Sequence, residues 1–344
     1  MPYDLARPVR ILIRPRLPVL ALLVLAPSIP ELLTGSTPIT TLFFDPIAFA
    51  LSFLGIVGLY GTGALLIREF AVRFRKGWAS ILLLGAGYGI VEEGFAVHSF
   101  FEPAGRAPVG ALGWYGHAVG VNWLWALGLT AFHAVYSIAL PILLVQLAFP
   151  SVKAVRWLDG GAAALVASVY GLVVALFAVV TGYGPSPVLS VLFLGILGLL
   201  VYLAYRVPED LLSVRSGPRR IGPWGLALDG AVFFLAWAIV LVLASGGGRV
   251  PAGVAALGLV GLSLGALSVI LLRVGSEGLD RSKFYFAAGM LGALFVWDGV
   301  LEFSIPGILL VTAAFAYLLY RLDRSLRERS RPSFPSGSAG PRTS

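Results

Sequence analysis

Residues 78–97 read W-A-S-I-L-L-L-G-A-G-Y-G-I-V-E-E-G-F-A-V, an apolar run that contains two adjacent glutamates, Glu92 and Glu93. An α-helix of about 20 residues spans the hydrocarbon core of a bilayer, so this run predicts a transmembrane helix. A charged side chain at the centre of a span costs about 2.5–3.5 kcal/mol on insertion scales, and ionisable residues there usually mark functional positions. The segment therefore indicates both the fold class and the most informative site of the chain.

The whole chain has the composition of an integral membrane protein. Of its 344 residues, 58% are hydrophobic and only 12% are charged, whereas a soluble domain carries about 25% charged residues. The chain has no cysteine, which excludes disulfides, thiolate catalysis and thiolate metal sites. The net charge of +8 does not indicate nucleic acid, because the basic residues lie beside predicted spans, where they orient the chain and meet anionic headgroups.

We predict an all-α polytopic membrane protein of about ten transmembrane helices, forming one domain over residues 1–322. The predicted spans lie near 17–35, 46–67, 78–97, 119–147, 161–181, 187–206, 224–245, 252–273, 284–302 and 305–321. With the N-terminus and C-terminus both cytoplasmic, every basic residue except Arg106 and Arg249 falls on the cytoplasmic side, as the positive-inside rule requires. Residues 323–344 are expected to form a largely disordered cytoplasmic tail. An uncleaved first helix is favoured over a signal peptide, and we expect a multi-pass protein of the plasma membrane.

One face of the helix quoted above carries small residues in line with the first glutamate. Gly85, Gly89, Glu92 and Ala96 are three or four residues apart, so they share one face of an α-helix. Small residues allow a neighbouring helix to approach closely. We therefore expect Glu92 to point into the helix bundle, and Glu93 to be rotated away from that face by about 100°.

The next span, 119–147, carries a polar stripe on an otherwise apolar helix. Its members are spaced as on one helix face and are Asn122, Thr130, His133 and Ser137. Helices joined by a single loop usually pack together, so the stripe is predicted to face the glutamates. Tyr136, next to Ser137, is also predicted to be a supporting polar residue of the site.

A further acidic residue, Glu31, lies within the first predicted span. Pro27 and Pro30 precede it and remove helix hydrogen bonds, and irregular backbone at membrane depth must be satisfied by protein or by a wet cavity. Glu31 is thus a candidate supporting residue, although a position at the outer interface is the plainer interpretation. The outer loop 98–120 carries aromatic residues that suit either a lid over the site or an interface anchor.

Three other acidic residues receive structural interpretations. Asp298 and Glu302 are four residues apart near a predicted outer hairpin, so we interpret them as an interfacial helix face. Glu69 lies among arginines and is expected to pair with Arg73 at the i+4 position.

The motifs within residues 69–140 resemble those of the CPBP membrane proteases, which process CAAX proteins and bacteriocins, and of the related PrsW-type proteases. Paired glutamates on one helix are followed about forty residues later by a histidine on the next helix. G-Y-G-I-V-E-E resembles the G-x-G-x-x-x-x-E element, and H-A-V-Y-S resembles the H-x-x-x-S/T element. The resemblance implies that Glu92 or Glu93 activates water and that His133 assists.

The chain also departs from that family's pattern. Val97 stands where the E-E-x-x-x-R motif has its arginine, and the later H-x-x-x-N motif is absent. The same clan includes a non-catalytic scaffold subunit. The chain is similar, too, to uncharacterised polytopic membrane proteins, which implies no activity.

Three functions therefore stay open. The leading hypothesis is a glutamate-type intramembrane hydrolase acting on a membrane peptide or a lipid-linked substrate, because a carboxylate and an imidazole suit general acid–base chemistry. A proton- or cation-coupled transporter, with Glu31, Glu92, Glu93 and His133 along its path, is the second, and a membrane scaffold is the third. No cofactor is expected, and no metal site, because the H-E-x-x-H spacing is absent. The lipid bilayer is the expected partner, with no role for nucleic acid.

Overall fold

The computed structural model of the chain describes residues 16–103, 113–212, 221–245, 250–273 and 279–329. Within these ranges the predicted spans are largely helical, and the sheet found there is a short antiparallel hairpin of β1 (His117–Ala118) and β2 (Val121–Asn122). The basic N-terminal residues, the outer-loop positions around Arg106, and the tail beyond Arg329 lie outside the described residues.

The α-helices follow the apolar runs of the sequence closely. In chain order they are α1 (Arg16–Pro27), α2 (Thr41–Phe44), α3 (Pro46–Ile56), α4 (Thr62–Arg73), α5 (Trp78–Gly89), α6 (Trp123–Phe132), α7 (Leu140–Ala148), α8 (Gly160–Thr181), α9 (Pro187–Arg206), α10 (Pro223–Ser245), α11 (Ala252–Arg273), α12 (Leu279–Leu301) and α13 (Ile308–Arg329). Two short 3₁₀ turns, Ser99–Phe101 and Pro150–Val152, lie in the connections.

Six helical stretches within the described ranges are long and apolar enough to cross a membrane. They are Pro46–Arg73, Trp78–Ala96, Trp123–Ala148, Gly160–Thr181, Pro187–Arg206 and Asp280–Leu301. α10 and α11 contribute shorter apolar pieces, and the predicted hairpin does separate α12 from α13. The fold is therefore that of a multi-pass helical membrane protein, as the sequence predicts.

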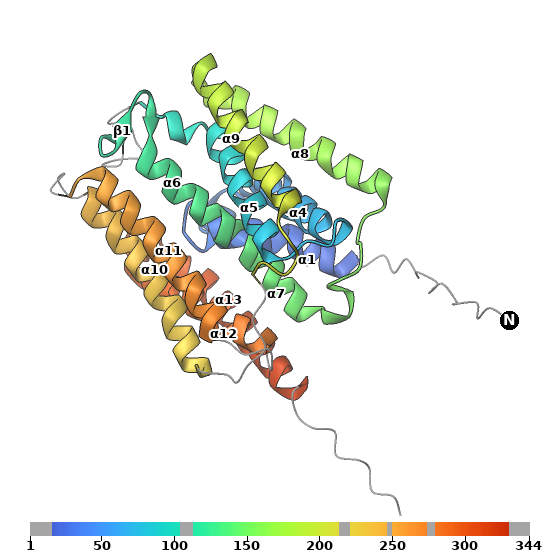
Figure 1. Ribbon diagram of the computed structural model, residues 1–344. Coiled ribbons are helices and arrows are strands. Elements are labelled where there is room, and N and C mark those ends of the chain that lie inside the picture. The colour runs from blue at the N-terminus through green and yellow to red at the C-terminus, as the bar shows by residue number, and fades with distance from the viewer. Residues whose placement is uncertain (1–15, 104–112, 213–220, 246–249, 274–278, 330–344) are drawn as a thin grey trace, which may run out of the picture.

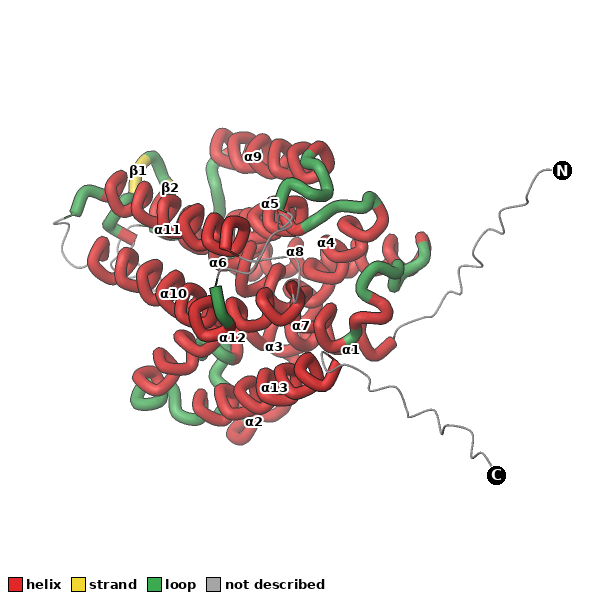
Figure 2. Tube along the Cα trace, turned by 60° about the horizontal axis from the view of Figure 1, so that its bottom comes forward, coloured by secondary structure: helices red, strands yellow, loops and turns green. Residues whose placement is uncertain are grey.

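The helices form a central group with further helices on either side. Figure 1 shows α8 and α9 on one side and α10, α11 and α12 on the other, with α5, α6 and α7 between them. α9 packs on α5 and α8 on α4, whereas α10 packs mainly on α12. Figure 2 shows α1 and α13 close together at another edge of the molecule. The outer helix α8 is apolar on all sides and its side chains are largely exposed, which is typical of a helix that faces lipid.

The last hairpin shows where the sequence interpretation needs correction. Asp298 is fully buried rather than interfacial, and Thr312 of α13 donates a hydrogen bond of 2.6 Å to its carboxylate. Glu302 accepts hydrogen bonds from the backbone N–H groups of Gly307 (2.8 Å) and Leu309 (3.0 Å), so it caps the first turn of α13. The two carboxylates therefore hold the α12–α13 hairpin together.

α13 also continues to Arg329, beyond the end of the predicted span at residue 321. Two ion pairs of i,i+4 spacing support this polar extension, Arg324 with Glu328 at 2.9 Å and Arg327 with Asp323 at 2.7 Å. Leu322 and Leu326 stay buried in the core, so the extension is an amphipathic helix with its ion pairs on the exposed side. Residues 323–329 are therefore helical, which corrects the predicted disordered tail over that part.

Four of the helices widen into π-helical turns. These segments are Ser28–Leu32, Val57–Gly61, Ile90–Ala96 and His133–Ala139. Pro27 and Pro30, which have no N–H to donate, account for the first of them. π-helical turns are rare and occur frequently at functional sites. The first segment and α5 both pack against the fourth segment, and α1 packs against the second, so the wide turns gather in one region.

A buried charged cluster ties α4 to the connection between α7 and α8. Arg68 is fully buried. Its guanidinium group donates a hydrogen bond to Glu69 and lies 3.7 Å from the ring centroid of Trp157. The guanidinium also donates to three backbone carbonyls of that connection, those of Val152 (3.0 Å), Lys153 (3.0 Å) and Val155 (2.6 Å). Arg68 is thus the closer partner of Glu69, and the predicted partner Arg73 lies 3.8 Å away.

Candidate functional site

Glu92, Glu93 and His133 meet in the middle of the bundle. The two glutamates lie in the π-helical segment Ile90–Ala96, and His133 begins the segment His133–Ala139. Glu93 Oε1 lies 3.0 Å from His133 Nε2, and Glu92 Oε2 lies 3.1 Å from His133 Nδ1. All three side chains are largely or fully buried. The imidazole ring is therefore flanked by a carboxylate at each nitrogen.

Two glycines of α5 allow this approach. A Cβ on Gly85 would stand 2.8 Å from the Cα of Ala134, and a Cβ on Gly89 would stand 3.2 Å from the Cβ of His133. The first distance is too short for real atoms, so any side chain at Gly85 would force the two helices apart. The predicted small-residue face of this helix therefore does lie against the helix that carries His133.

Both glutamates reach the ring of His133, although they are neighbours in the sequence. A regular α-helix would rotate Glu93 by about 100° relative to Glu92. The helix instead enters a π-helical turn at Ile90, directly before the glutamates. The wider turn changes the direction of the side chains, and both carboxylates reach the same ring.

Glu93 is held from its other side by the chain that follows the helix. The hydroxyl of Ser99, at the start of the outer loop, donates to Glu93 Oε2. The indole N–H of Trp125 donates to the same hydroxyl at 3.0 Å. Glu93, Ser99 and Trp125 therefore form a connected chain of hydrogen bonds that fixes one carboxylate against His133 Nε2.

Glu92 is less completely bonded. His133 Nδ1 forms a hydrogen bond of 2.8 Å with Ser137 Oγ, and the same nitrogen faces Glu92 Oε2. One ring nitrogen carries a single proton or a single lone pair. Among the described residues, Glu92 Oε2 has no hydrogen-bond partner of good geometry. The cluster therefore contains one carboxylate that is bonded on both oxygens and one whose buried Oε2 faces the ring without a hydrogen bond to any described residue.

Tyrosines and a third glutamate extend the cluster toward α1. The rings of Tyr60 and Tyr88 each lie 6.0 Å from the imidazole ring, measured between centroids. The Tyr60 hydroxyl donates to Glu31 Oε1 at 2.7 Å, and Thr37 donates to the other oxygen at 2.8 Å. Glu31 is thus tied into the bundle and does not simply mark an interface.

The remaining predicted supporting residues have separate roles. Ser137 contacts the ring directly, as described above. Asn122 is buried and donates to the backbone carbonyl of Glu102 at 3.0 Å, so it shapes the outer loop. Thr130 lies with its backbone against Gly89. The Tyr136 ring stacks on Phe132 with centroids 4.9 Å apart, and no described contact joins it to the carboxylates.

The outer loop folds back over the cluster in the part that the structure describes. Phe100 is fully buried and packs against Phe193 of α9. Glu102 bonds to the hydroxyl of Tyr183, just before α9. Together with the bond from Ser99 to Glu93, these contacts make the start of the loop a cover for the site.

The sequence analysis missed four residues of the site. Tyr60, Tyr88, Ser99 and Trp125 reach the cluster only because helices and loop pack as they do. The segment G-L-Y-G-T-G around Tyr60 gave one usable hint, because a lone tyrosine among small residues faces a closely packed neighbour.

The three central side chains have the donor set of a cation site. One donor atom from each of Glu92, Glu93 and His133 lies within 4.8 Å of the others. Two carboxylates and an imidazole suit divalent ions such as zinc. Binding an ion at His133 would require the ring to release Ser137 or Glu93, since both nitrogens already have protein partners.

Comparisons with other proteins identify a family and leave the chemistry open. Neither the curated proteins nor the solved structures give a match. None of the comparisons shows the resemblance to glutamate intramembrane proteases, which stays a prediction from the short motifs in residues 69–140. A family model described as an uncharacterized membrane protein family matches residues 20–322. Because this match covers most of the chain, the protein belongs to that uncharacterized membrane protein family.

Proposed function

We propose that this protein is a glutamate-dependent intramembrane hydrolase whose working centre consists of Glu92, Glu93 and His133. The observation that carries the proposal is the buried imidazole with a carboxylate 3.0 Å from one nitrogen and a second carboxylate 3.1 Å from the other. Acid–base chemistry requires groups within hydrogen-bond reach of one another, and a carboxylate–imidazole pair is a common arrangement for activating water.

The two carboxylates divide the work in this proposal. Glu93 is held by Ser99 and orients the ring. Glu92 has the incompletely bonded oxygen and accepts a proton from the attacking water as that water bonds to the substrate's carbonyl carbon. His133 donates a proton to the leaving group as the scissile bond breaks, and proton transfer from Glu92 back to the ring resets the site.

The proposed topology has ten crossings of the plasma membrane with both chain ends in the cytoplasm. The charge distribution supports it, since all basic residues except Arg106 and Arg249 then lie on the cytoplasmic side. The cluster would lie within the bilayer, where its substrates are membrane peptides or lipid-linked molecules.

A cleavage assay in membranes tests the proposal. Wild type and the variants Glu92→Gln, Glu93→Gln and His133→Ala would be expressed at equal level, and new protein N-termini and lipid products mapped by mass spectrometry. We expect products with wild type, and losses of about 10²–10⁴-fold in each variant. Glu302→Gln, which changes a carboxylate at the α12–α13 turn, is the matched control and should retain the products. The same products at the same level in all three site variants would reject the hydrolase.

A chelator arm separates the acid–base site from a metal site. If purified protein keeps its activity in EDTA, the three side chains act as proposed. If activity is lost and a divalent ion such as zinc restores it, the same residues are metal ligands and the assignment of Glu92 as general base is wrong.

A second function, proton-coupled transport, is favoured by one separate observation. Glu31 joins the cluster through Tyr60, whose hydroxyl donates to it at 2.7 Å and whose ring centroid lies 6.0 Å from that of His133. Ionisable groups in such a series form proton pathways in membrane transporters. In proteoliposomes with an enclosed pH dye, Glu31→Gln should abolish proton movement if the series is a pathway. If the protein is a hydrolase and no transporter, liposomes with wild type and liposomes with Glu31→Gln should both show the same proton flux as empty liposomes.

A further inference from the structure

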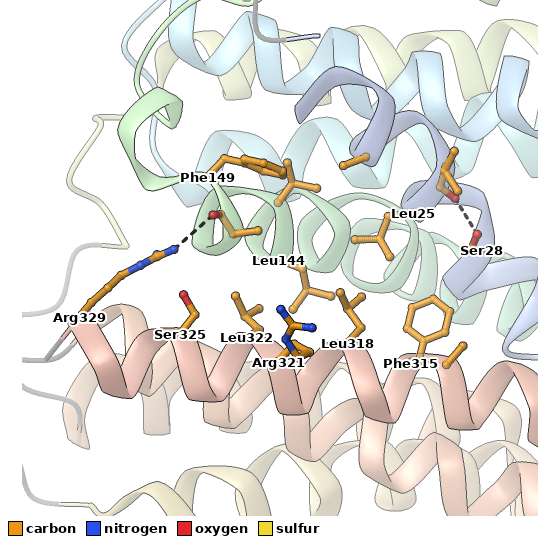
Figure 3. A pocket seen from close by; sticks show the side chains of 15 residues that line it. Leu25, Ser28, Leu144, Phe149, Phe315, Leu318, Arg321, Leu322, Ser325 and Arg329 are labelled. Carbon is orange, nitrogen blue, oxygen red and sulfur yellow. Dashed lines mark hydrogen bonds between the residues drawn. The ribbon is translucent and has the colours of Figure 1, made fainter. Parts of the chain in front are cut away.

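A cavity of about 540 Å³ lies between α1, α7 and α13, apart from the Glu92–His133 cluster. Its walls are mainly apolar, with Leu25 from α1, Leu144 from α7 and Phe315 and Leu318 from α13. Figure 3 shows that the lining changes in character along α13, from these apolar side chains to Arg321, Ser325 and Arg329. The cavity therefore has an apolar part and a basic end.

The basic end is built on one face of a helix. Arg321, Ser325 and Arg329 are four residues apart, so they share one side of α13 and span about 12 Å along its axis. Arg329 reaches across to α7, where it donates to the backbone carbonyl of Leu147 at 2.9 Å. Arg321 donates to the hydroxyl of Tyr317 at 2.9 Å.

The arginines of α13 fall into two groups. Arg324 and Arg327, which do not line the cavity, form ion pairs with Glu328 and Asp323. Arg321 and Arg329, which line the cavity, form no ion pair with any carboxylate in the part of the chain that the structure describes. The positive charge that faces the cavity is therefore not balanced by any carboxylate of the described residues.

We propose that this cavity binds an anionic membrane lipid, with its phosphate at Arg321, Ser325 and Arg329 and one acyl chain along Leu25, Leu144 and Phe315. The guanidinium group bonds phosphate oxygens with two parallel N–H donors, and a serine hydroxyl adds a third kind of donor. Basic pockets between transmembrane helices bind phospholipid headgroups in this way. The volume lies within the range of ligand pockets, and the apolar walls match a hydrocarbon chain.

The position of the cavity agrees with a lipid from the leaflet in which α13 ends. Val24 of α1 and Leu318 of α13 are 49% and 40% exposed at its edge, so an acyl chain can enter from the side. Such a site would join α1 to α13, the first and last helices that the structure describes. This inference does not depend on the hydrolase proposal, because it uses none of the residues of the Glu92–His133 cluster.

Native mass spectrometry of the detergent-solubilised chain tests the lipid site. Phosphatidylglycerol is the anionic probe and phosphatidylcholine the neutral one, each titrated against wild type and variants. Arg321→Ala with Arg329→Ala should weaken phosphatidylglycerol binding by about tenfold or more, and leave phosphatidylcholine binding unchanged. Arg324→Ala with Arg327→Ala is the matched control, because it removes the same charge from the same helix outside the cavity. That control should change binding less than about twofold.

Two further variants keep the test decisive. Ala314→Trp fills the cavity from an exposed position on α13 and should reduce the binding of both lipids. Arg321→Lys with Arg329→Lys keeps the charge and removes the forked donors, so it should bind phosphatidylglycerol more weakly than wild type and more strongly than the double alanine variant. Equal losses of phosphatidylglycerol binding in the cavity pair and the control pair would overturn the proposal, since general surface charge would then explain the attraction. Unchanged binding in the cavity pair would overturn it as well.

Discussion

Two buried charged clusters lie in this bundle, and they differ in how completely their polar atoms are bonded. Around Arg68, the guanidinium bonds to Glu69 and to three backbone carbonyls, and only its Nε lacks a partner among the described residues. Around His133, one carboxylate is held on both oxygens and the other leaves Oε2 without a hydrogen bond.

Under the proposed function, this difference distinguishes a structural site around Arg68 from a reactive site around His133. A buried ion pair that satisfies its donors with backbone carbonyls fixes two chain segments and has little left to offer a ligand. An incompletely bonded carboxylate beside an imidazole costs stability in the empty protein. Proteins keep such costly groups where activity requires them. The side chains of both clusters are buried to a similar degree. The hydrogen bonding of each polar atom is therefore more useful than burial for telling a structural cluster from a functional one.

Removing Arg68 should have the largest effect on stability. Arg68→Met leaves Glu69 buried without its closest cation, and breaking a buried pair in this way costs about 3–5 kcal/mol. We expect a large drop in the thermal midpoint in nanodiscs, and partial recovery in Arg68→Met combined with Glu69→Leu. Arg206→Met, an exposed arginine at the end of α9, is the control. An unchanged midpoint for Arg68→Met would show that the first cluster is not structural.

Separating the helices that carry the second cluster should have the next largest effect. Gly85→Ala places a methyl group 2.8 Å from the Cα of Ala134, so the helices must shift, at a cost of about 1–3 kcal/mol. Any hydrolase activity should fall with it, because His133 moves relative to the glutamates. Gly171→Ala on α8 meets no atom within 4 Å and serves as the control in both the thermal and the activity measurements. Equal midpoints for the two variants would contradict the close packing at Gly85.

The two glutamates should respond differently to the same substitution. Glu93→Gln disturbs bonds from both His133 and Ser99 and should destabilise the protein by about 1–2 kcal/mol. Glu92→Gln removes an incompletely bonded carboxylate and should be neutral within about 0.5 kcal/mol, or stabilising. Thermal midpoints measured side by side decide this. If Glu92→Gln costs as much as Glu93→Gln, Glu92 is a structural residue like Glu69.

The smallest expected effect on the thermal midpoint is at Glu302. This carboxylate lies outside the two buried clusters and serves as a comparison for both. Backbone N–H groups of Gly307 and Leu309 donate to it and hold its pKa below the ordinary value of 4.5. A carboxylate with a lowered pKa in the folded state adds stability above its unfolded pKa and loses it as the pH falls through the folded value. The thermal midpoint of Glu302→Gln should therefore fall less than that of wild type between about pH 5 and pH 3. Parallel pH profiles would contradict the capping role.

The sequence predicts the helices well and the site only in part. Apolar length locates the helical runs because the bilayer fixes how long they must be, and His133 with Glu92 follows from helix periodicity. Glu93 is predicted as a site residue, but helix periodicity does not show how it reaches the ring, because no pattern in the sequence predicts the π-helical turn at Ile90. The end of α13 was placed too early, because its last turns are amphipathic: Leu322 and Leu326 pack in the core while charged residues cover the other side.

Long-range contacts account for what remained hidden. Ser99 reaches Glu93 only because the outer loop folds back, and Arg68 finds its carbonyl partners more than 80 residues away in the chain. Polar atoms in such contacts have no fixed spacing in sequence. Periodicity therefore cannot find them, whereas it can find neighbours on one helix face.

The π-helical turns also restrict how this family can change in length. Each wide turn holds an additional residue relative to an α-helix, and one residue corresponds to a rotation of about 100°. Deleting a single residue within Ile90–Ala96 or His133–Ala139 would turn the wide turn into a regular α-helical turn, and the helix on either side would keep its register. The side chains inside the turn would change direction, because the additional residue is what sets it. A one-residue deletion there should therefore separate the two glutamates from His133 while the rest of the bundle keeps its contacts.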